Sequence, residues 1–278
     1  MNCEQLEKWL TKCSNDSETA NWNLSNTKKC PKCSTRIEKN QGCNHMNCRQ
    51  CKNEFCWICM GNWADHGAST GGYYKCNRFG GADAEDAKAE DGKELSSAER
   101  AKRELDRYLH YYQRFHNHDQ AGKFAVKAIV KSEQRMEELQ EASGGQSWVD
   151  VEFLRHATEC LVECRRVLKY TYVLGFYMAS GKERDLFEFL QEDLEKHTEL
   201  LTENTEKPIE EMNRPDIVNY TRVTTQFREK LLADCGSLTD TGEAAEGASA
   251  RWEIGMCWGC GRCGGLLPKV VRLRSQAK

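Results

Sequence analysis

The sequence lacks features that mark several common classes of protein. No apolar run approaches the length needed to cross a bilayer, and the first ten residues contain two glutamates and no apolar core of a signal peptide. There is also no basic excess: the net charge is -3 over 278 residues, whereas nucleic-acid binders usually carry a strong basic surface. We therefore expect a soluble protein with no membrane and no nucleic-acid partner.

Cysteine is scarce in the middle two-thirds of the chain and dense near its start. Of the 16 cysteines, eight lie between Cys30 and Cys76. Without a secretory signal the expected compartment is reducing, cytoplasmic and/or nuclear, where such thiols bind metal or act in catalysis and do not form disulfides. A unit this small, rich in Gly and Asn, needs metal to fold.

The spacing of these cysteines predicts two structural zinc ions. Structural zinc is tetrahedral and closed, so two ions need eight ligands, and the segment offers ten candidates, eight cysteines and two histidines. Three C-x-x-C pairs, in which a tight turn presents two thiolates to one ion, give the partition. The expected ligands are Cys30, Cys33, Cys48 and Cys51 for the first ion and Cys56, Cys59, His66 and Cys76 for the second.

Two candidates, Cys43 and His45, are then left over on the loop between Cys33 and Cys48. One alternative makes Cys43 a ligand in place of Cys48 or Cys51, but this breaks an intact pair. Another makes Cys43 an inert small hydrophobe, but its small and polar neighbours favour exposure, and exposed thiols are the reactive kind. We therefore expect Cys43 to be a nucleophile.

His45 has two possible roles beside such a nucleophile. It either lowers the pKa of the thiol or removes the proton from an amine that attacks a thioester on Cys43. A lysine amine has a reference pKa of about 10.4 and is protonated at neutral pH. The second role is therefore the more necessary chemically.

Outside this unit the sequence predicts helices. The expected divisions are a helical linker over 1–28, the zinc unit over 29–79, an acidic flexible linker over 80–95, a helical domain over 96–235 and a disordered tail over 236–278. Ser96 and Glu99 form a capping box, and apolar seams predict helices from 96 to about 115, over 124–139, from 147 to about 180, over 186–201 and from about 215. Long helices with short connections imply an antiparallel bundle.

The zinc unit and the helices both resemble a known family. The segments "CPKCSTRIEKNQGCNHMNCRQCKNEFCWICMGNWADHG" and "ECRRVLKYTYVLGFYM" are similar to the Rcat (RING2) and Ariadne domains of RING-between-RING E3 ubiquitin ligases of the Ariadne subfamily. The likeness runs from about residue 3 to about residue 235. It implies that Cys43 accepts ubiquitin from an E2 enzyme as a thioester, that His45 assists transfer to a substrate lysine, and that the eight ligands bind two zinc ions.

The resemblance also implies restraint. In such proteins the Ariadne helices fold over the catalytic cysteine, and neddylated cullin-RING complexes release them. Phe124 and Glu199 match restraining residues of the family, but Ala125 stands where the family has a glutamate. The alternatives are ordinary core packing for Phe124 and a solvated helix face for Glu199.

The sequence departs from the family at both ends. Relatives carry a RING1, which recruits the E2, and an in-between-RING domain before the Rcat, whereas this chain starts where those domains would have ended. The tail after Cys235 also departs, and a fragment, a splice form or a gene-model error would explain both. The alternative function is a non-catalytic adaptor that binds ubiquitin or the cullin-RING machinery. A third hypothesis is a zinc-ribbon protein that binds nucleic acid, but the sequence lacks the basic, aromatic surface that such a protein needs.

Overall fold

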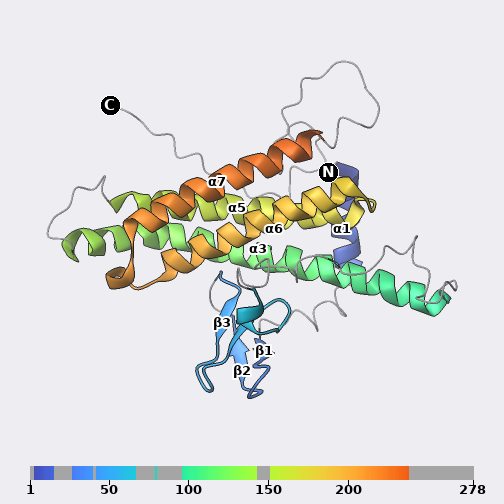
Figure 1. Ribbon diagram of the computed structural model, residues 1–278, viewed down its shortest axis with the longest axis horizontal. Coiled ribbons are helices and arrows are strands. Elements are labelled where there is room, and N and C mark those ends of the chain that lie inside the picture. Colours follow the sequence, from blue (N-terminus) through green and yellow to red (C-terminus); the bar gives the residue numbers. More distant parts are fainter. Residues whose placement is uncertain are drawn as a thin grey trace.

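The computed structural model describes residues 3–15, 27–39, 42–66, 79, 96–142 and 151–237 (Figure 1). A layer of long helices forms the larger part, and a small module of short strands lies against its middle. Cys76, the predicted linker over 80–95 and the predicted tail from 238 onward lie outside the described residues. None of the described helices is long and apolar enough to cross a membrane.

The helices form the antiparallel bundle that the apolar seams predict. Each long helix packs against the next in the chain and runs in the opposite direction (Figure 1). The helices are α1 (Cys3–Asn15), α3 (Ser97–Ala142), α5 (Phe153–Tyr177), α6 (Lys182–Glu206) and α7 (Arg214–Ser237), with the short 3-10 turn η4 (Ile209–Glu211) before α7. The main core lies among α5, α6 and α7, with Met136 from α3.

The first long helix, α3, differs from the expectation of two helices. It is continuous over 46 residues and contains no proline. Its start is the predicted capping box: the Ser96 backbone N–H donates to the Glu99 carboxylate (2.8 Å), and the Glu99 N–H donates to the Ser96 hydroxyl (3.3 Å). Gly122 lies against α5, where an added Cβ would be 3.7 Å from the Arg165 Cβ. One glycine costs a helix only about 1 kcal/mol, which packing against α5 overcomes.

Many apolar residues of the predicted helices are buried, whereas Ala101, Leu105 and Leu186 are exposed. Val151, Leu154 and Leu168 are each at most 3% exposed. Leu105 and Leu186 were expected in the apolar seams, but they are 47% and 55% exposed. Helical spacing identifies a face, but whether that face is covered depends on the neighbouring helices.

The N-terminal helix α1 is part of the helical body, although the sequence suggested a linker. Trp9 is fully buried in an aromatic cluster from α3 and α5. Its ring lies 5.7 Å from Tyr108, 5.7 Å from Phe115 and 5.2 Å from Phe176, between ring centroids. Aromatic groups in tilted and edge contacts stabilise each other beyond simple burial. Helix α1 is therefore anchored on the bundle through Trp9.

Replacing Trp9 should destabilise the bundle. Trp9→Ala removes a buried indole and leaves a cavity, so we expect the free energy of unfolding to fall by about 3–5 kcal/mol. Denaturant unfolding followed by circular dichroism would measure it. Lys8→Ala, at an exposed position on the same helix, should leave the unfolding midpoint unchanged. Equal midpoints for Trp9→Ala and the unaltered protein would show that α1 contributes nothing to the core.

The small module contains two antiparallel hairpins. Strand β1 (Thr27–Lys29) pairs with β2 (Arg36–Glu38), and β3 (His45–Asn47) pairs with β4 (Glu54–Cys56). The 3-10 turn η1 (Trp63–His66) follows β4. Strands of three residues offer little burial, so the module depends on what its cysteines bind.

Candidate functional site

Three turns of the module share one backbone geometry. In each C-x-x-C turn, the N–H of the residue after the second cysteine donates to the carbonyl of the first, at 2.8–2.9 Å. That residue has positive φ in every case: Ser34 (60°), Lys52 (57°) and Met60 (62°). The left-handed residue folds each turn so that its two sulfurs face the same way. The repetition indicates three equivalent metal-binding turns.

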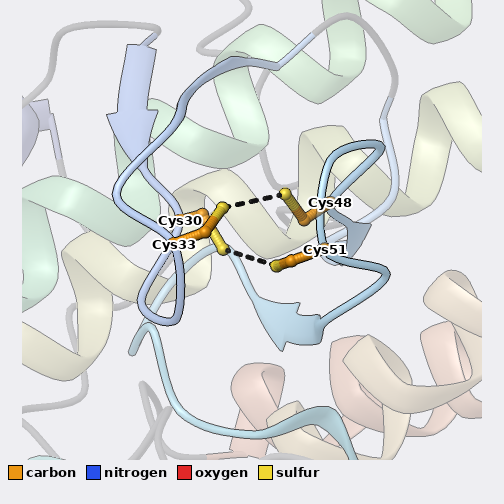
Figure 2. Close-up of side chains that lie close together, drawn as sticks. All are labelled: Cys30, Cys33, Cys48 and Cys51. Carbon is orange, nitrogen blue, oxygen red and sulfur yellow. Dashed lines mark hydrogen bonds between the residues drawn. The ribbon is translucent and has the colours of Figure 1, made fainter.

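The first two turns bring four sulfurs together (Figure 2). The Cys30 and Cys51 sulfurs are 3.7 Å apart, and those of Cys33 and Cys48 are 3.6 Å apart. Two sulfurs bound at 2.3 Å to one tetrahedral zinc ion lie about 3.8 Å apart. The four thiols therefore fit a closed zinc site, in the grouping that the spacing predicts.

The third turn forms a second cluster with η1. Cys56, Cys59 and His66 place their ligand atoms within 4.8 Å of one another. The His66 Nε2 lies 3.2 Å from the Cys59 sulfur, and its Nδ1 lies 3.0 Å from the carbonyl oxygen of Asn62. A backbone partner on the second ring nitrogen is usual for a metal-binding histidine. The predicted fourth ligand, Cys76, lies outside the described residues.

Among the cysteines of the described part of the module, Cys43 alone belongs to neither cluster. It follows Gly42 on the loop that leads into β3, and the His45 backbone N–H donates to its sulfur (3.3 Å). The expectation that Cys43 is exposed is wrong for this conformation, since the residue is only 8% exposed. The reason is tertiary: α3 and α6 cover the loop.

The environment of Cys43 disfavours its thiolate. Burial raises the pKa of the Cys43 thiol well above its usual value, and the nearby Glu199 carboxylate raises it further. A thiol that stays protonated is a poor nucleophile. The conformation described here is therefore a closed form of the site.

A buried polar network ties the Cys43 loop to the helices. The Glu199 carboxylate on α6 accepts hydrogen bonds from the backbone N–H (2.7 Å) and side-chain amide (3.1 Å) of Asn44. It also accepts one from Arg165 on α5 at 2.5 Å. Glu199 is 3% exposed, so it does not lie on a solvated helix face. It binds the residue next to Cys43 directly.

Lys39 extends this network to α3. Its amine donates to the side-chain oxygens of Asn44 and Asn117, each at 2.8 Å, and the Asn117 amide donates to Asn44 (3.0 Å). Burial lowers the pKa of Lys39 to about 8. The sequence does not point to Lys39, Asn117 and Arg165, because no local spacing connects residues on separate helices with a loop.

A further contact and a cavity lie beside the loop. The Gly42 N–H donates to the Glu206 carboxylate at the end of α6 (3.2 Å). A cavity of about 140 Å³ lies between Gly42 and helices α3, α5 and α6, and Phe124 and Ala125 form part of its wall. Phe124 is half-buried. Its position beside the loop is compatible with restraint and with core packing alike, so its role stays a prediction.

His45 is the first residue of β3 and follows Cys43 by two residues along the chain. Its Nε2 is 3.6 Å from a carboxylate oxygen of Glu54 on β4. Glu54 was also missed, although the hairpin register, with His45 opposite Cys56, puts it within reach diagonally. The site thus combines a thiol, an imidazole and a carboxylate on one small scaffold.

Comparison with known proteins finds two family models that match parts of this chain. The family model described as "IBR domain" matches residues 25–73, and the family model described as "Ariadne domain" matches residues 106–228. The chain is 43% identical over 83% of its length to the E3 ubiquitin-protein ligase ariadne-1 of Drosophila melanogaster, of which it covers 44%. It is 41% identical over 90% of its length to the E3 ubiquitin-protein ligase dbl4 of Schizosaccharomyces pombe, of which it covers 47%.

A human relative has a similar level of identity to this chain. Over 78% of its length the chain is 43% identical to the E3 ubiquitin-protein ligase ARIH1 of Homo sapiens, of which it covers 37%. The chain therefore spans less than half the length of these curated relatives. With a cysteine-rich zinc-binding module followed by an Ariadne helical domain, it belongs to the Ariadne subfamily of RING-between-RING proteins.

Proposed function

We propose that the chain is the catalytic and regulatory part of a RING-between-RING E3 ubiquitin transferase. Its partners are ubiquitin, an E2 enzyme and a substrate protein, in the cytoplasm and/or the nucleus. The observation that carries this proposal is the position of Cys43: a thiol outside both cysteine clusters, two residues before a histidine. The same surplus thiol favours a catalytic Rcat over a purely structural zinc domain.

The proposed reaction has two steps. In the first, the Cys43 thiolate attacks the carbonyl carbon of the E2–ubiquitin thioester, and the E2 sulfur leaves as a thiolate. In the second, a substrate lysine loses a proton to His45 and its amine attacks the carbonyl carbon of the new thioester. The isopeptide bond forms as the bond to sulfur breaks, and the second proton of the nitrogen passes to the leaving sulfur, which restores the Cys43 thiol. His45 is needed in the second step because an ammonium group has no lone pair with which to attack.

Two zinc ions complete this proposal. The first is held by Cys30, Cys33, Cys48 and Cys51, and the second by Cys56, Cys59, His66 and Cys76. When bound, the ions supply folding energy and a rigid mount for the loop that carries Cys43. They take no part in the reaction, because a site closed by four protein ligands has no position for substrate.

Removing the metal should unfold the module and leave the bundle folded. Chelation takes away the main stabilising element of residues 30–76, whereas the helices have an independent core. We expect release of two zinc equivalents, new proteolytic cleavage within residues 30–76 and little loss of helical circular dichroism. If the helical signal collapsed together with the module, the two parts would not be independent folding units.

We also propose that the helical domain restrains the enzyme. Glu199 holds Asn44 from α6, and Lys39 and Asn117 tie the same asparagine to α3. Ala125 lacks the carboxylate that the resemblance places after Phe124, so the restraint here relies on Glu199 more heavily. A neddylated cullin-RING complex is the proposed activating partner.

The test of the proposed function is a ubiquitin adduct on the chain. The protein is mixed with an E2 enzyme charged with ubiquitin and resolved with and without reductant. An adduct that reductant removes supports the transferase. The buried state of Cys43 favours a second candidate, a non-catalytic adaptor. Partner binding that is indifferent to Cys43→Ala, with no thioester at any E2 concentration, would support the adaptor instead.

A further inference from the structure

Three aromatic rings of the module form a nearly parallel stack. The His45 imidazole lies on the Trp63 indole with centroids 4.4 Å apart and an angle of 7° between the planes. Trp63 also stacks on His66, at 5.5 Å and 8°. Trp63 and His66 are the two ends of η1. The stack therefore joins the histidine beside Cys43 to a residue of the second cysteine cluster.

His45 is held from several directions, and among the ring contacts of the described residues Trp63 is the one that stacks on its face. Its backbone pairs with Cys56 in the β3–β4 hairpin. At its edge, Nε2 faces Glu54 at 3.6 Å, longer than a hydrogen bond. The backbone pairing fixes where the side chain begins but not the rotation of the imidazole, which is a broad torsion. Among the contacts described for His45, the indole face is the one that sets the plane of its ring.

We propose that Trp63 is a positioning residue for the transfer of ubiquitin to lysine: it fixes the plane of the His45 imidazole through face-to-face stacking. This inference rests on the proposed function. A base must lie within about 2.6–3.2 Å of the atom whose proton it takes, so free rotation of the ring lowers the fraction of productive complexes. Stacking on one face restricts that rotation without using the ring nitrogens. In this closed conformation Nε2 is buried and has no hydrogen-bond partner among the described residues.

The two steps of the reaction should respond differently to the loss of this stack. Thioester exchange onto Cys43 uses a thiol nucleophile and a thiol leaving group, and it needs no proton removed from an amine. Transfer to lysine needs His45. General acid–base catalysis is typically worth 10²–10⁴-fold, and a misplaced base loses part of it. Trp63→Leu should therefore slow discharge to lysine by roughly 10-fold and leave loading within about threefold.

The experiment loads Cys43 from ubiquitin carrying a small-molecule C-terminal thioester, which requires no E2 docking. Single-turnover loading and discharge to free lysine are followed separately for the unaltered chain, Trp63→Leu and Trp63→Tyr. The tyrosine variant keeps an aromatic face and should restore discharge to within about threefold of the unaltered chain. Bound zinc is measured for each variant, and two equivalents are expected in all of them.

A double-mutant cycle separates positioning from a general structural effect. If Trp63 acts through His45, then Trp63→Leu causes no further slowing of discharge in a His45→Ala background. Additive slowing in the double variant, or equal discharge by Trp63→Leu and the unaltered chain, would overturn the inference. Loss of zinc and of loading in both Trp63 variants would also overturn it, in favour of a structural role. Failure of the unaltered chain to form any thioester would instead reject the proposed function itself.

Discussion

Cys43→Ala is expected to abolish the ubiquitin thioester on the chain and to reduce transfer to substrate by about 1,000-fold or more, as removal of a covalent nucleophile does. The remaining cysteines of the described module point into the two clusters, where metal would occupy their sulfurs. None of them can replace the lost nucleophile without giving up a ligand. Non-reducing electrophoresis and intact-protein mass spectrometry after mixing with charged E2 would measure the adduct.

Two further variants make this test specific. Cys43→Ser keeps a nucleophilic atom in place and should trap ubiquitin as an oxyester, which resists thiol reductants and is cleaved by base. Cys3→Ala changes an exposed cysteine on α1, outside the module, and should load normally. Ubiquitin that remains on the Cys43→Ala chain, or an adduct of the unaltered chain that survives reductant, would contradict covalent catalysis at Cys43.

Glu199→Ala should have the opposite effect and accelerate loading. The substitution removes both hydrogen bonds to Asn44 and leaves Arg165 buried without its carboxylate. Breaking such a buried pair costs about 3–5 kcal/mol. Part of this free energy is lost from the closed state alone, in which the Cys43 loop packs on α6, so the closed state becomes less stable relative to an open one. We expect the rate of thioester formation to rise by roughly 10-fold, since a shift of 1.4 kcal/mol between closed and open states changes their ratio by about that factor.

The opening can be followed without ubiquitin. With zinc bound, alkylation of Cys43 should be faster in Glu199→Ala than in the unaltered chain, because the thiol leaves an environment that raises its pKa. Glu203→Ala, at an exposed position one turn further along α6, is the matched control and should change nothing. Asn117→Ala loosens the same loop from α3 and leaves the Arg165–Glu199 pair intact. If Glu199→Ala and Asn117→Ala both fold normally and form the thioester no faster than the unaltered chain, Glu199 does not restrain Cys43.

Local spacing predicts much of this protein. A C-x-x-C turn needs only one left-handed residue to aim both sulfurs at one point, and the chain repeats that turn three times. The grouping of seven ligand candidates into two clusters follows from order along the chain. The capping box at Ser96 and the heptad-like seams predict helices for the same reason, since their signals lie within one or two turns.

The sequence-based predictions that the structure contradicts also have a common cause. The apolar seams predicted one helix that ends near residue 115 and another that begins at 124, but α3 is continuous across this stretch and Gly122 packs against Arg165 of α5. Small polar neighbours suggested an exposed Cys43, but two helices more than seventy residues away cover it. A solvated face was one reading of Glu199, but a loop and an arginine from α5 enclose its carboxylate.

The sequence by itself therefore determined the cysteine turns, the thiol that they leave over, the histidine two residues after it, and the helices that follow. Only the tertiary structure decided the environment of that thiol: it is buried, its pKa is raised, and its loop is tied to α3 and α6 through Asn44. The physical reason is that ligand spacing and helix periodicity are set by covalent neighbours, whereas burial and pKa are set by whichever distant surface the fold brings against a group.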